Sequence, residues 1–314
     1  MLRGHPSVFA WCCHNETPWV HGLDRPQLQG VNRALDRALF RIATTRDGSR
    51  YVHLNSATGD QHVYYGWYRG NYRRYASYNG RPLVTEYGAQ ALPVKASLRR
   101  MFGHVPRLPR NRKEALEWQY HCFQPEQTFQ VARVPLGRNL NEFIANSQGY
   151  QSRLLQFATG HFRRAKWRGT SGLMQFAWCD PWPCVSWSVV DYWRAPKPGA
   201  NALKRAFQPV LPSISVPHSH IEGGAPSASF RAGIWAVNDL PFRLPGAHIS
   251  WEMRGGGRVV LHGGRTMDIP ADSSVMAAEF GAPGGLAGRF RITARITAAG
   301  KGIRAGNSAD LSFT

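Results

Sequence analysis

Residues 1–208 alternate short apolar blocks with amphipathic stretches, a pattern that predicts strands and helices in turn. Residues 7–13 (SVFAWCC) predict a buried strand, and residues 51–55, 61–65 and 83–87 predict short β-rich strands bounded by turn formers. Between the first two strands, residues 27–42 predict a helix whose apolar face holds Val31, Leu35, Leu39 and Ile42.

The second half of this region predicts the longest helix. Asn139 followed by Glu142 is a capping-box pattern, and the apolar periodicity continues to about Trp167. Residues 172–179 predict another buried strand, and residues 200–207 a closing helix. Because strands and helices alternate, we expect these elements to form a parallel sheet.

The composition changes at residues 209–212 (PVLP), after which glycine pairs and alternating stretches dominate. In residues 289–297, one face of the predicted strand carries Phe290, Ile292, Ala294 and Ile296. Such alternation over about a hundred residues is typical of an antiparallel β-sandwich. We therefore expect two domains, an α/β domain over residues 1–208 and an all-β domain over residues 209–314.

Charge and composition limit the classes of function. The 314 residues carry 39 Lys+Arg against 19 Asp+Glu, a formal net charge of +20, while 43% of residues are hydrophobic. The arginines are spread along the chain and no recognised nucleic-acid motif is present, so we expect a solvated basic surface and no nucleic-acid partner. Nucleic-acid binding stays open as a third interpretation, which weak heparin retention would exclude.

Other segments of the chain give negative expectations. No run approaches the roughly 20 apolar residues that a membrane span needs, so we expect no membrane partner. The first residues contain no apolar secretory segment, and a cytoplasmic location is the default expectation. The five cysteines lack zinc-ligand spacing and no His/Cys/Asp cluster appears along the sequence, so we expect no metal and no cofactor.

Two glutamates follow or end predicted strands. Glu16 comes directly after the strand at residues 7–13, and Glu86 lies near the end of the strand at residues 83–87. In α/β barrels the chemistry lies where strands reach their carboxyl ends. Two carboxylates there suit retaining glycoside hydrolysis, although a glutamate at a strand end is more often a solvated or ion-paired loop residue.

The surrounding segments favour the catalytic interpretation. The stretches HPSV…NE at residues 5–16 and TEYGAQALP at residues 85–93 resemble the two active-site signatures of glycoside hydrolase family 2, in its β-mannosidase and exo-β-glucosaminidase branch. The similarity continues through GLMQFAWCDPWP at residues 172–183 and SWSVVDY at residues 186–192, and WAVND at residues 235–239 resembles a strand of the family's C-terminal domains. Cys12 and Cys13 depart from the Gly and Asn that are frequent there in that branch.

This resemblance implies a retaining exo-β-glycosidase that acts on a β-linked oligosaccharide or glycoside without a cofactor. Glu16 would be the general acid/base, Glu86 the nucleophile, and Asn15 would hydrogen-bond the sugar 2-hydroxyl. The acid should be the less solvated of the two glutamates, beside Trp11 and Trp19, because it must stay protonated near neutral pH.

The resemblance also implies sugar-binding residues elsewhere. Residues 60–68 look like the sixth strand of the barrel, in which His62 and Tyr64 point either into the site or into an aromatic packing layer. Two interpretations apply to Trp178, Asp180 and Trp182. Either the indoles form a platform for the sugar and the carboxylate binds a sugar hydroxyl, or the three residues are structural, as part of the core and a cap.

In the family, the Asn-Glu strand is the fourth of eight. We therefore expect an incomplete TIM barrel, strands four to eight, followed by an immunoglobulin-like β-sandwich. Unpaired sheet edges should then make the isolated chain a weak or inactive hydrolase, with the missing N-terminal part of the enzyme as its partner. The alternative is a non-catalytic fragment that acts as a carbohydrate-binding or partner-complementing module.

Overall fold

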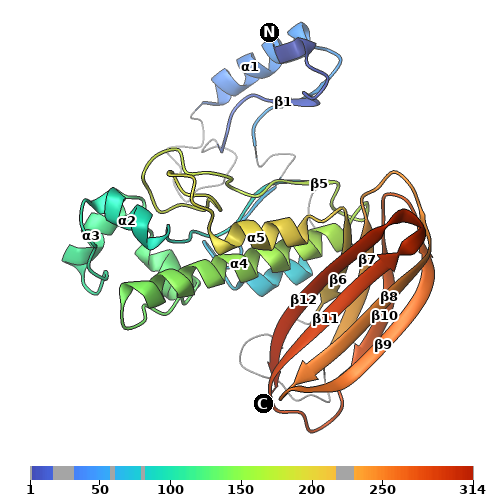
Figure 1. Cartoon of the computed structure of the whole chain (residues 1–314). Coiled ribbons are helices and arrows are strands. Elements are labelled where there is room, and N and C mark those ends of the chain that lie inside the picture. The colour runs from blue at the N-terminus through green and yellow to red at the C-terminus, as the bar shows by residue number, and fades with distance from the viewer. Residues whose placement is uncertain (1, 17–31, 57–60, 79–81, 217–229, 314) are drawn as a thin grey trace. The chain divides into compact units, whose positions relative to one another are not determined.

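The computed structural model describes residues 2–16, 32–56, 61–78, 82–216 and 230–313 (Figure 1). The chain divides into two compact units. The first consists of residues 1–63, 79–87 and 169–175, and the second of residues 64–78, 88–168 and 176–314. Within the described residues, no helix is both long and apolar enough to cross a membrane.

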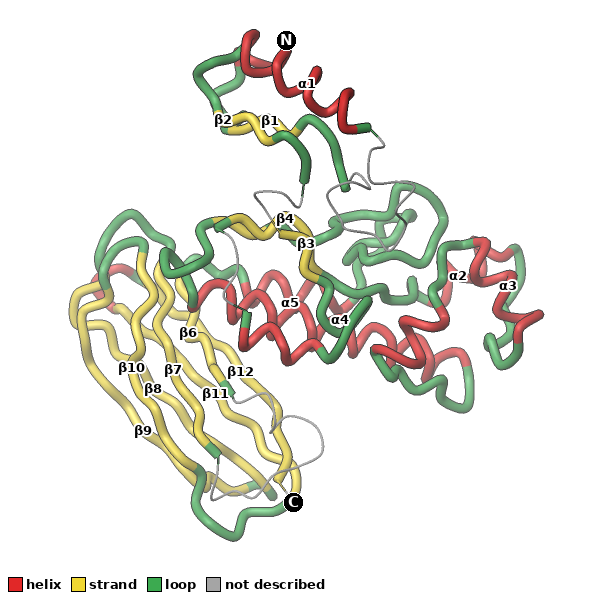
Figure 2. Tube along the Cα trace, turned by 180° about the vertical axis from the view of Figure 1, so that it is seen from behind, coloured by secondary structure: helices red, strands yellow, loops and turns green. Residues whose placement is uncertain are grey.

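The first unit contains parallel strands, as the sequence predicts. β1 (Ala10–Cys12) pairs with β2 (Tyr51–His53), and α1 (Arg33–Arg46) lies between them in the chain. A second parallel sheet has the order β3-β4-β5, with β3 at Gln61–Val63, β4 at Leu83–Tyr87 and β5 at Gly172–Leu173. Figure 2 shows β3 and β4 as neighbours. A short 3-10 turn, η1 (Leu2–Gly4), precedes β1.

The strand expected at residues 172–179 is much shorter in the structure. Only Gly172 and Leu173 pair with β4, and residues 174–197 form an irregular segment held by isolated bridges such as Cys179 to Val190. The carbonyls of Ala177 and Trp178 accept hydrogen bonds of 3.1 and 2.9 Å from the N–H groups of Val189 and Val190, so this part of the chain pairs with a following loop. Apolar content alone therefore predicted too long a strand here.

Helices fill the first part of the second unit. They are η3 (Tyr72–Ser77), α2 (Lys95–Phe102), α3 (Arg112–Tyr120), a π-helical turn η4 (Gln127–Val131), α4 (Leu140–Arg164) and α5 (Pro198–Ala206). The capping box of α4 is confirmed, because the side chain of Asn139 accepts a hydrogen bond of 3.0 Å from the backbone N–H of Glu142. α4 and α5 lie side by side (Figure 1).

Two antiparallel sheets follow, as the alternation beyond residue 209 predicts. One has the order β10-β7-β6 and the other β12-β11-β8-β9 (Figure 2). Their strands are β6 (Val210–Ser215), β7 (Arg231–Asn238), β8 (Leu244–Gly255), β9 (Arg258–Ile269), β10 (Ser273–Gly281), β11 (Gly288–Ala298) and β12 (Ile303–Phe313), with the 3-10 turn η7 (Ala299–Lys301) before the last.

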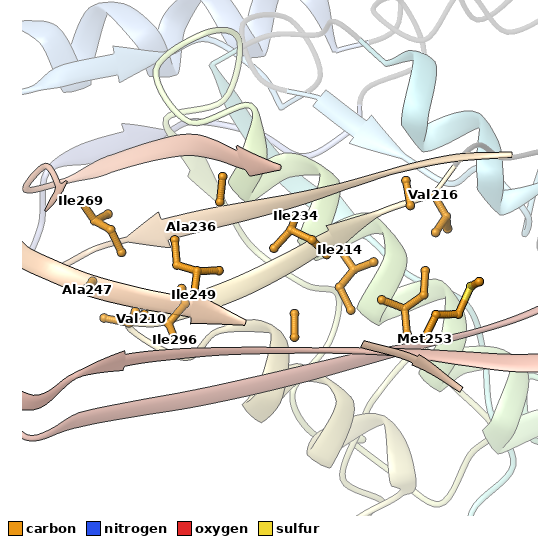
Figure 3. Close-up of a cluster of buried hydrophobic side chains, with 14 of the residues drawn as sticks. Val210, Ile214, Val216, Ile234, Ala236, Ala247, Ile249, Met253, Ile269 and Ile296 are labelled. Carbon is orange, nitrogen blue, oxygen red and sulfur yellow. The ribbon is translucent and has the colours of Figure 1, made fainter. Parts of the chain in front are cut away.

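The two antiparallel sheets share one hydrophobic core. The residues predicted on one face of β11, Phe290, Ile292, Ala294 and Ile296, are all buried in it. Ile214 and Ile234 come from one sheet, and Ile249 and Met253 from the other (Figure 3). A period-two pattern buries one face of each strand, which is why alternation predicted this core well.

His161 is expected to make the stability of the second unit depend on pH. This residue of α4 donates a hydrogen bond from Nε2 to the Tyr78 carbonyl at 3.1 Å. Burial, with the nearby Arg164 guanidinium, lowers the pKa of His161 to about 4. Between pH 6.5 and 4 the unfolded chain binds the proton more readily than the folded chain. Stability should therefore fall as the pH drops through this window, by about 3 kcal/mol in total.

Urea unfolding between pH 7 and 4 measures this contribution. His161→Gln keeps a donor for the Tyr78 carbonyl but does not titrate. As the pH falls, the free energy of unfolding of the wild type should therefore decrease relative to that of His161→Gln. Equal slopes for both proteins across the window would contradict the assignment.

Candidate active site

Three strands of the first unit position two glutamates and a histidine. Glu16 follows β1, His62 lies in β3 and Glu86 lies in β4. His62 and Glu86 are register partners in the parallel β3–β4 pair, so their side chains leave the same face of the sheet.

The side chains of these three residues converge. His62 Nδ1 hydrogen-bonds Glu16 Oε1 and lies 3.4 Å from Glu86 Oε2. One nitrogen or oxygen from each of the three residues lies within 4.8 Å of the others. The sequence predicted that Glu16 and Glu86 would meet although they are far apart in the chain, and the structure brings them together.

The relative exposure of the two glutamates is the reverse of our expectation. The side chain of Glu16 is 40% exposed and that of Glu86 is 17% exposed. Trp11, expected beside Glu16, instead donates its indole N–H to Asp47 at 2.9 Å. Trp19, the second expected neighbour, lies outside the described residues. The greater exposure of Glu16 does not fit the expectation that the acid is the less solvated of the two glutamates.

Ser56 holds the Asn15–Glu16 segment in place. Its hydroxyl accepts a hydrogen bond from the backbone N–H of Glu16 at 2.9 Å and donates to Asn15 Oδ1 at 2.7 Å. Glu16 has a backbone φ of 46°, in the left-handed region that residues other than glycine rarely occupy. Such a conformation costs free energy and persists where the surroundings enforce it, often at a functional site.

A buried carboxylate supports the same segment and was not predicted. Asp36 of α1 is fully buried and contacts His14 Nδ1 at 2.6 Å. Its second oxygen accepts a hydrogen bond of 3.0 Å from Asn55. Asp36 thus links α1 to the residues that follow β1 and β2. The sequence offered no signal for it, since a polar helix residue is normally exposed.

The same three side chains could hold a metal ion. Glu16, His62 and Glu86 supply two carboxylates and an imidazole, the donor types that divalent cations bind in proteins. The expectation of no metal rested on ligand spacing along the sequence, and the fold assembles this group from three separate segments. His62 Nδ1 already contacts Glu16, so a metal ion would have to replace that hydrogen bond.

The other predicted sugar-binding residues belong to the second unit. Tyr64 is buried, with its ring 5.3 Å from that of Tyr68 and 6.3 Å from that of Trp187. Trp178 is 69% exposed, whereas Trp182 is 37% exposed and stacks on His121 at 5.9 Å. Both tryptophans offer an accessible indole, and Tyr64 lies in an aromatic cluster.

Asp180 points into the protein. It is 4% exposed, and its Oδ1 accepts hydrogen bonds from the hydroxyls of Ser186 and Ser188. The ammonium group of Lys197, itself buried, lies 4.0 Å from its Oδ2. The predicted contact between Asp180 and a sugar hydroxyl stays a prediction, and the described contacts make Asp180 part of a buried polar network.

Comparison with known proteins gives a consistent likeness. No family model matches the chain. It is 23% identical over 279 residues to β-mannosidase B of Emericella nidulans, covering 76% of this chain and 32% of that protein. Against β-mannosidase B of Neosartorya fischeri the identity is 24% over 281 residues, 78% of this chain and 33% of that protein. The chain thus spans about a third of the length of these relatives.

Solved structures show the same likeness of fold. The β-D-mannosidase from Dictyoglomus thermophilum superposes with a TM-score of 0.74 at 23% identity, covering 100% of this chain and 39% of that one. The chain resembles the β-mannosidase branch of glycoside hydrolase family 2. An exo-chitosanase from Amycolatopsis orientalis superposes with a TM-score of 0.68 at 15% identity, covering 100% of this chain and 37% of that one. This β-mannosidase-like chain therefore shares its mixed α/β fold with part of larger glycoside hydrolases.

Proposed function

We propose that this chain carries the catalytic pair of a retaining exo-β-glycosidase that acts on β-mannosides. The observation that supports it is the approach of Glu16, His62 and Glu86 to within 4.8 Å of one another. Retaining glycosidases place their two carboxyl groups roughly 5–5.5 Å apart, whereas inverting enzymes leave roughly 6.5–9.5 Å for a water molecule. One carboxylate oxygen of Glu16 lies within 4.8 Å of one of Glu86, which favours double displacement.

Each residue has a separate role in the proposed reaction. Glu86 attacks the anomeric carbon, while Glu16 gives its proton to the leaving oxygen. Water then attacks the glycosyl-enzyme ester, gives its proton to Glu16, and Glu86 leaves as the carboxylate. His62 contacts both carboxylates and positions them. The Ser56 hydroxyl fixes Asn15 Oδ1, which orients the Asn15 amide nitrogen to donate to the sugar 2-hydroxyl.

From the similarity to glycoside hydrolase family 2, we also propose a more detailed architecture. β1 to β5 would be strands four to eight of a TIM barrel, within a domain of residues 1–208. The two antiparallel sheets would be an immunoglobulin-like sandwich over residues 209–314. On the same likeness, we propose that Trp178 and Trp182 form a sugar platform and that Asp180 binds a sugar hydroxyl. Tyr64 stays proposed as a substrate-binding residue.

We also propose that the 314-residue chain is a slow catalyst alone. In the described residues its parallel strands form separate sheets of two and three strands, which leaves edges unpaired. The N-terminal part of a family 2 enzyme would be the partner that completes them. This same observation favours the second candidate, a module without activity that binds carbohydrate or complements a partner chain.

Hydrolysis of p-nitrophenyl β-mannoside tests the proposal. The expected result is slow release of p-nitrophenol, well below the typical rate of about 10 per second. Proton NMR should show β-mannose as the first product, because two displacements retain configuration. The rate should not change with EDTA. α-Mannose as the first product would contradict double displacement. No release would favour the module, and a rate near 10 per second would refute the slow-catalyst proposal.

A further inference from the structure

A basic groove lies within the second unit. It encloses about 1500 Å³ and is lined by the start of η3, the residues after η4, one face of α4, the β8–β9 turn, and parts of β11 and β12. These segments are far apart in the sequence, so the groove exists only in the folded chain.

The lining residues carry mostly one sign of charge. Six arginines contribute to the groove, against a single carboxylate from Asp310; the arginines are Arg73, Arg133, Arg153, Arg254, Arg289 and Arg291. A cleft lined by one sign of charge concentrates ions of the opposite sign, because the low-dielectric walls focus the field. The occupant should therefore be anionic.

Three of these arginines are available to a ligand. Arg291 pairs with Asp310 at 2.6 Å, and Arg254 pairs with Glu252 at 2.9 Å. Arg133, Arg153 and Arg289 are exposed, and no carboxylate of the described residues lies within 4.0 Å of their guanidinium nitrogens. A guanidinium group donates two parallel hydrogen bonds to a carboxylate or sulfate, which suits these three side chains to such groups.

We propose that this groove binds an acidic polysaccharide through its carboxylate or sulfate groups. Its volume exceeds the roughly 300–1,000 Å³ of pockets for small molecules, so an extended chain fits better than a single anion. Single-stranded nucleic acids bind largely by stacking bases on exposed aromatic rings. The aromatic residues that line this groove, Tyr72, Tyr150 and Phe290, are all buried. That observation favours a polysaccharide over a single-stranded nucleic acid.

Titration calorimetry with defined oligomers tests the groove. The probes are hexamannuronate, a neutral α-linked mannohexaose of the same length, which is not a β-mannoside, and a single-stranded hexathymidylate. We expect hexamannuronate to bind at least tenfold more tightly than mannohexaose at low salt, and to weaken as salt screens the charges. The experiment uses the full 314-residue chain. It does not depend on the proposed hydrolase function, since binding is measured directly.

Two matched triple variants separate a site from overall charge. Arg133→Gln, Arg153→Gln and Arg289→Gln together should weaken hexamannuronate binding at least tenfold. A control that replaces the exposed Arg37, Arg41 and Arg46 of α1 removes the same charge and should change it less than twofold.

Equal losses in both triple variants would overturn the proposal, as would equal binding of mannohexaose or tighter binding of hexathymidylate. If the triple glutamine variant unfolds at a lower temperature than wild type, Arg289→Lys replaces it. This substitution keeps the charge and removes the paired donors, and it should weaken binding by at least twofold. Unchanged affinity in that variant would also overturn the proposal.

Discussion

Replacing Glu86 with glycine is expected to lower hydrolysis of p-nitrophenyl β-mannoside by roughly 10³-fold or more, since the covalent route is lost with the nucleophile. Glu86 lies 3.4 Å from His62 Nδ1 and is the less exposed of the two glutamates. Glu279→Gln, at an exposed position of β10, is the matched control and should keep wild-type activity.

Added azide distinguishes the role of Glu86 from that of Glu16. In Glu86→Gly, azide attacks the anomeric carbon from the vacated side and should give the α-mannosyl azide by one displacement. In Glu16→Ala, Glu86 still forms the glycosyl ester, and azide replaces water in the second step to give the β-azide. The same azide anomer from both variants would show that the roles are wrongly assigned.

A covalent trap makes this test independent of slow turnover. A 2-deoxy-2-fluoro-β-mannosyl fluoride should add one fluorosugar to the wild-type chain, with the label on the peptide that contains Glu86. Glu86→Gly should not be labelled. Labelling at another residue would contradict the assignment of the nucleophile.

Replacing either Asp180 or Lys197 alone is expected to lower the free energy of unfolding by about 3–5 kcal/mol, because the remaining charge then stays buried without its partner. Lys197 is 1% exposed, and its Nζ donates to the Ala91 carbonyl at 2.9 Å and to the Ser188 hydroxyl at 3.0 Å. Burial lowers the pKa of Lys197, and the neighbouring carboxylates of Asp180 and Asp191 oppose that shift.

A double-mutant cycle in urea measures this pair. Asp180→Asn and Lys197→Met should each destabilise the protein strongly, and the double variant should lose less than the sum, because no unpaired charge remains. Asp310→Asn provides the contrast. Its pair with Arg291 has side chains that are 71% and 62% exposed, so the loss should be at most about 1 kcal/mol. Additive losses for Asp180 and Lys197 would show that the network does not couple them.

Local patterns predicted some of the regular elements well, although α1 begins later than expected and Leu35 and Ile42, predicted on its apolar face, are 49% and 58% exposed. The capping box at Asn139 and the alternation in β11 depend on neighbouring residues, so the sequence carries them directly. The convergence of Glu16 and Glu86 was predicted through the family resemblance together with the rule that parallel strands end at one edge.

Features that depend on distant residues were missed. Asp36 supports His14 and Asn55 only because α1 packs beside β2, and nothing local marks it. The basic groove gathers arginines from residue 73 to residue 291, which the sequence shows as scattered charge. The segment after Leu173 is apolar enough for a strand, yet the carbonyls of residues 177 and 178 accept hydrogen bonds from residues 189 and 190, which no local pattern indicates.

The first unit consists of three separate stretches of the chain, which limits the order in which it can fold during synthesis. β3 and β4 can pair soon after they are made, but their third strand, β5, follows only after residues 88–168, which belong to the other unit, have been synthesised. At a synthesis rate of about 5–20 residues per second, the edge of β4 that pairs with β5 stays unpaired for several seconds. A nascent chain would therefore expose an incomplete sheet while α4 is being synthesised. We expect a chaperone to bind the chain mainly at this stage.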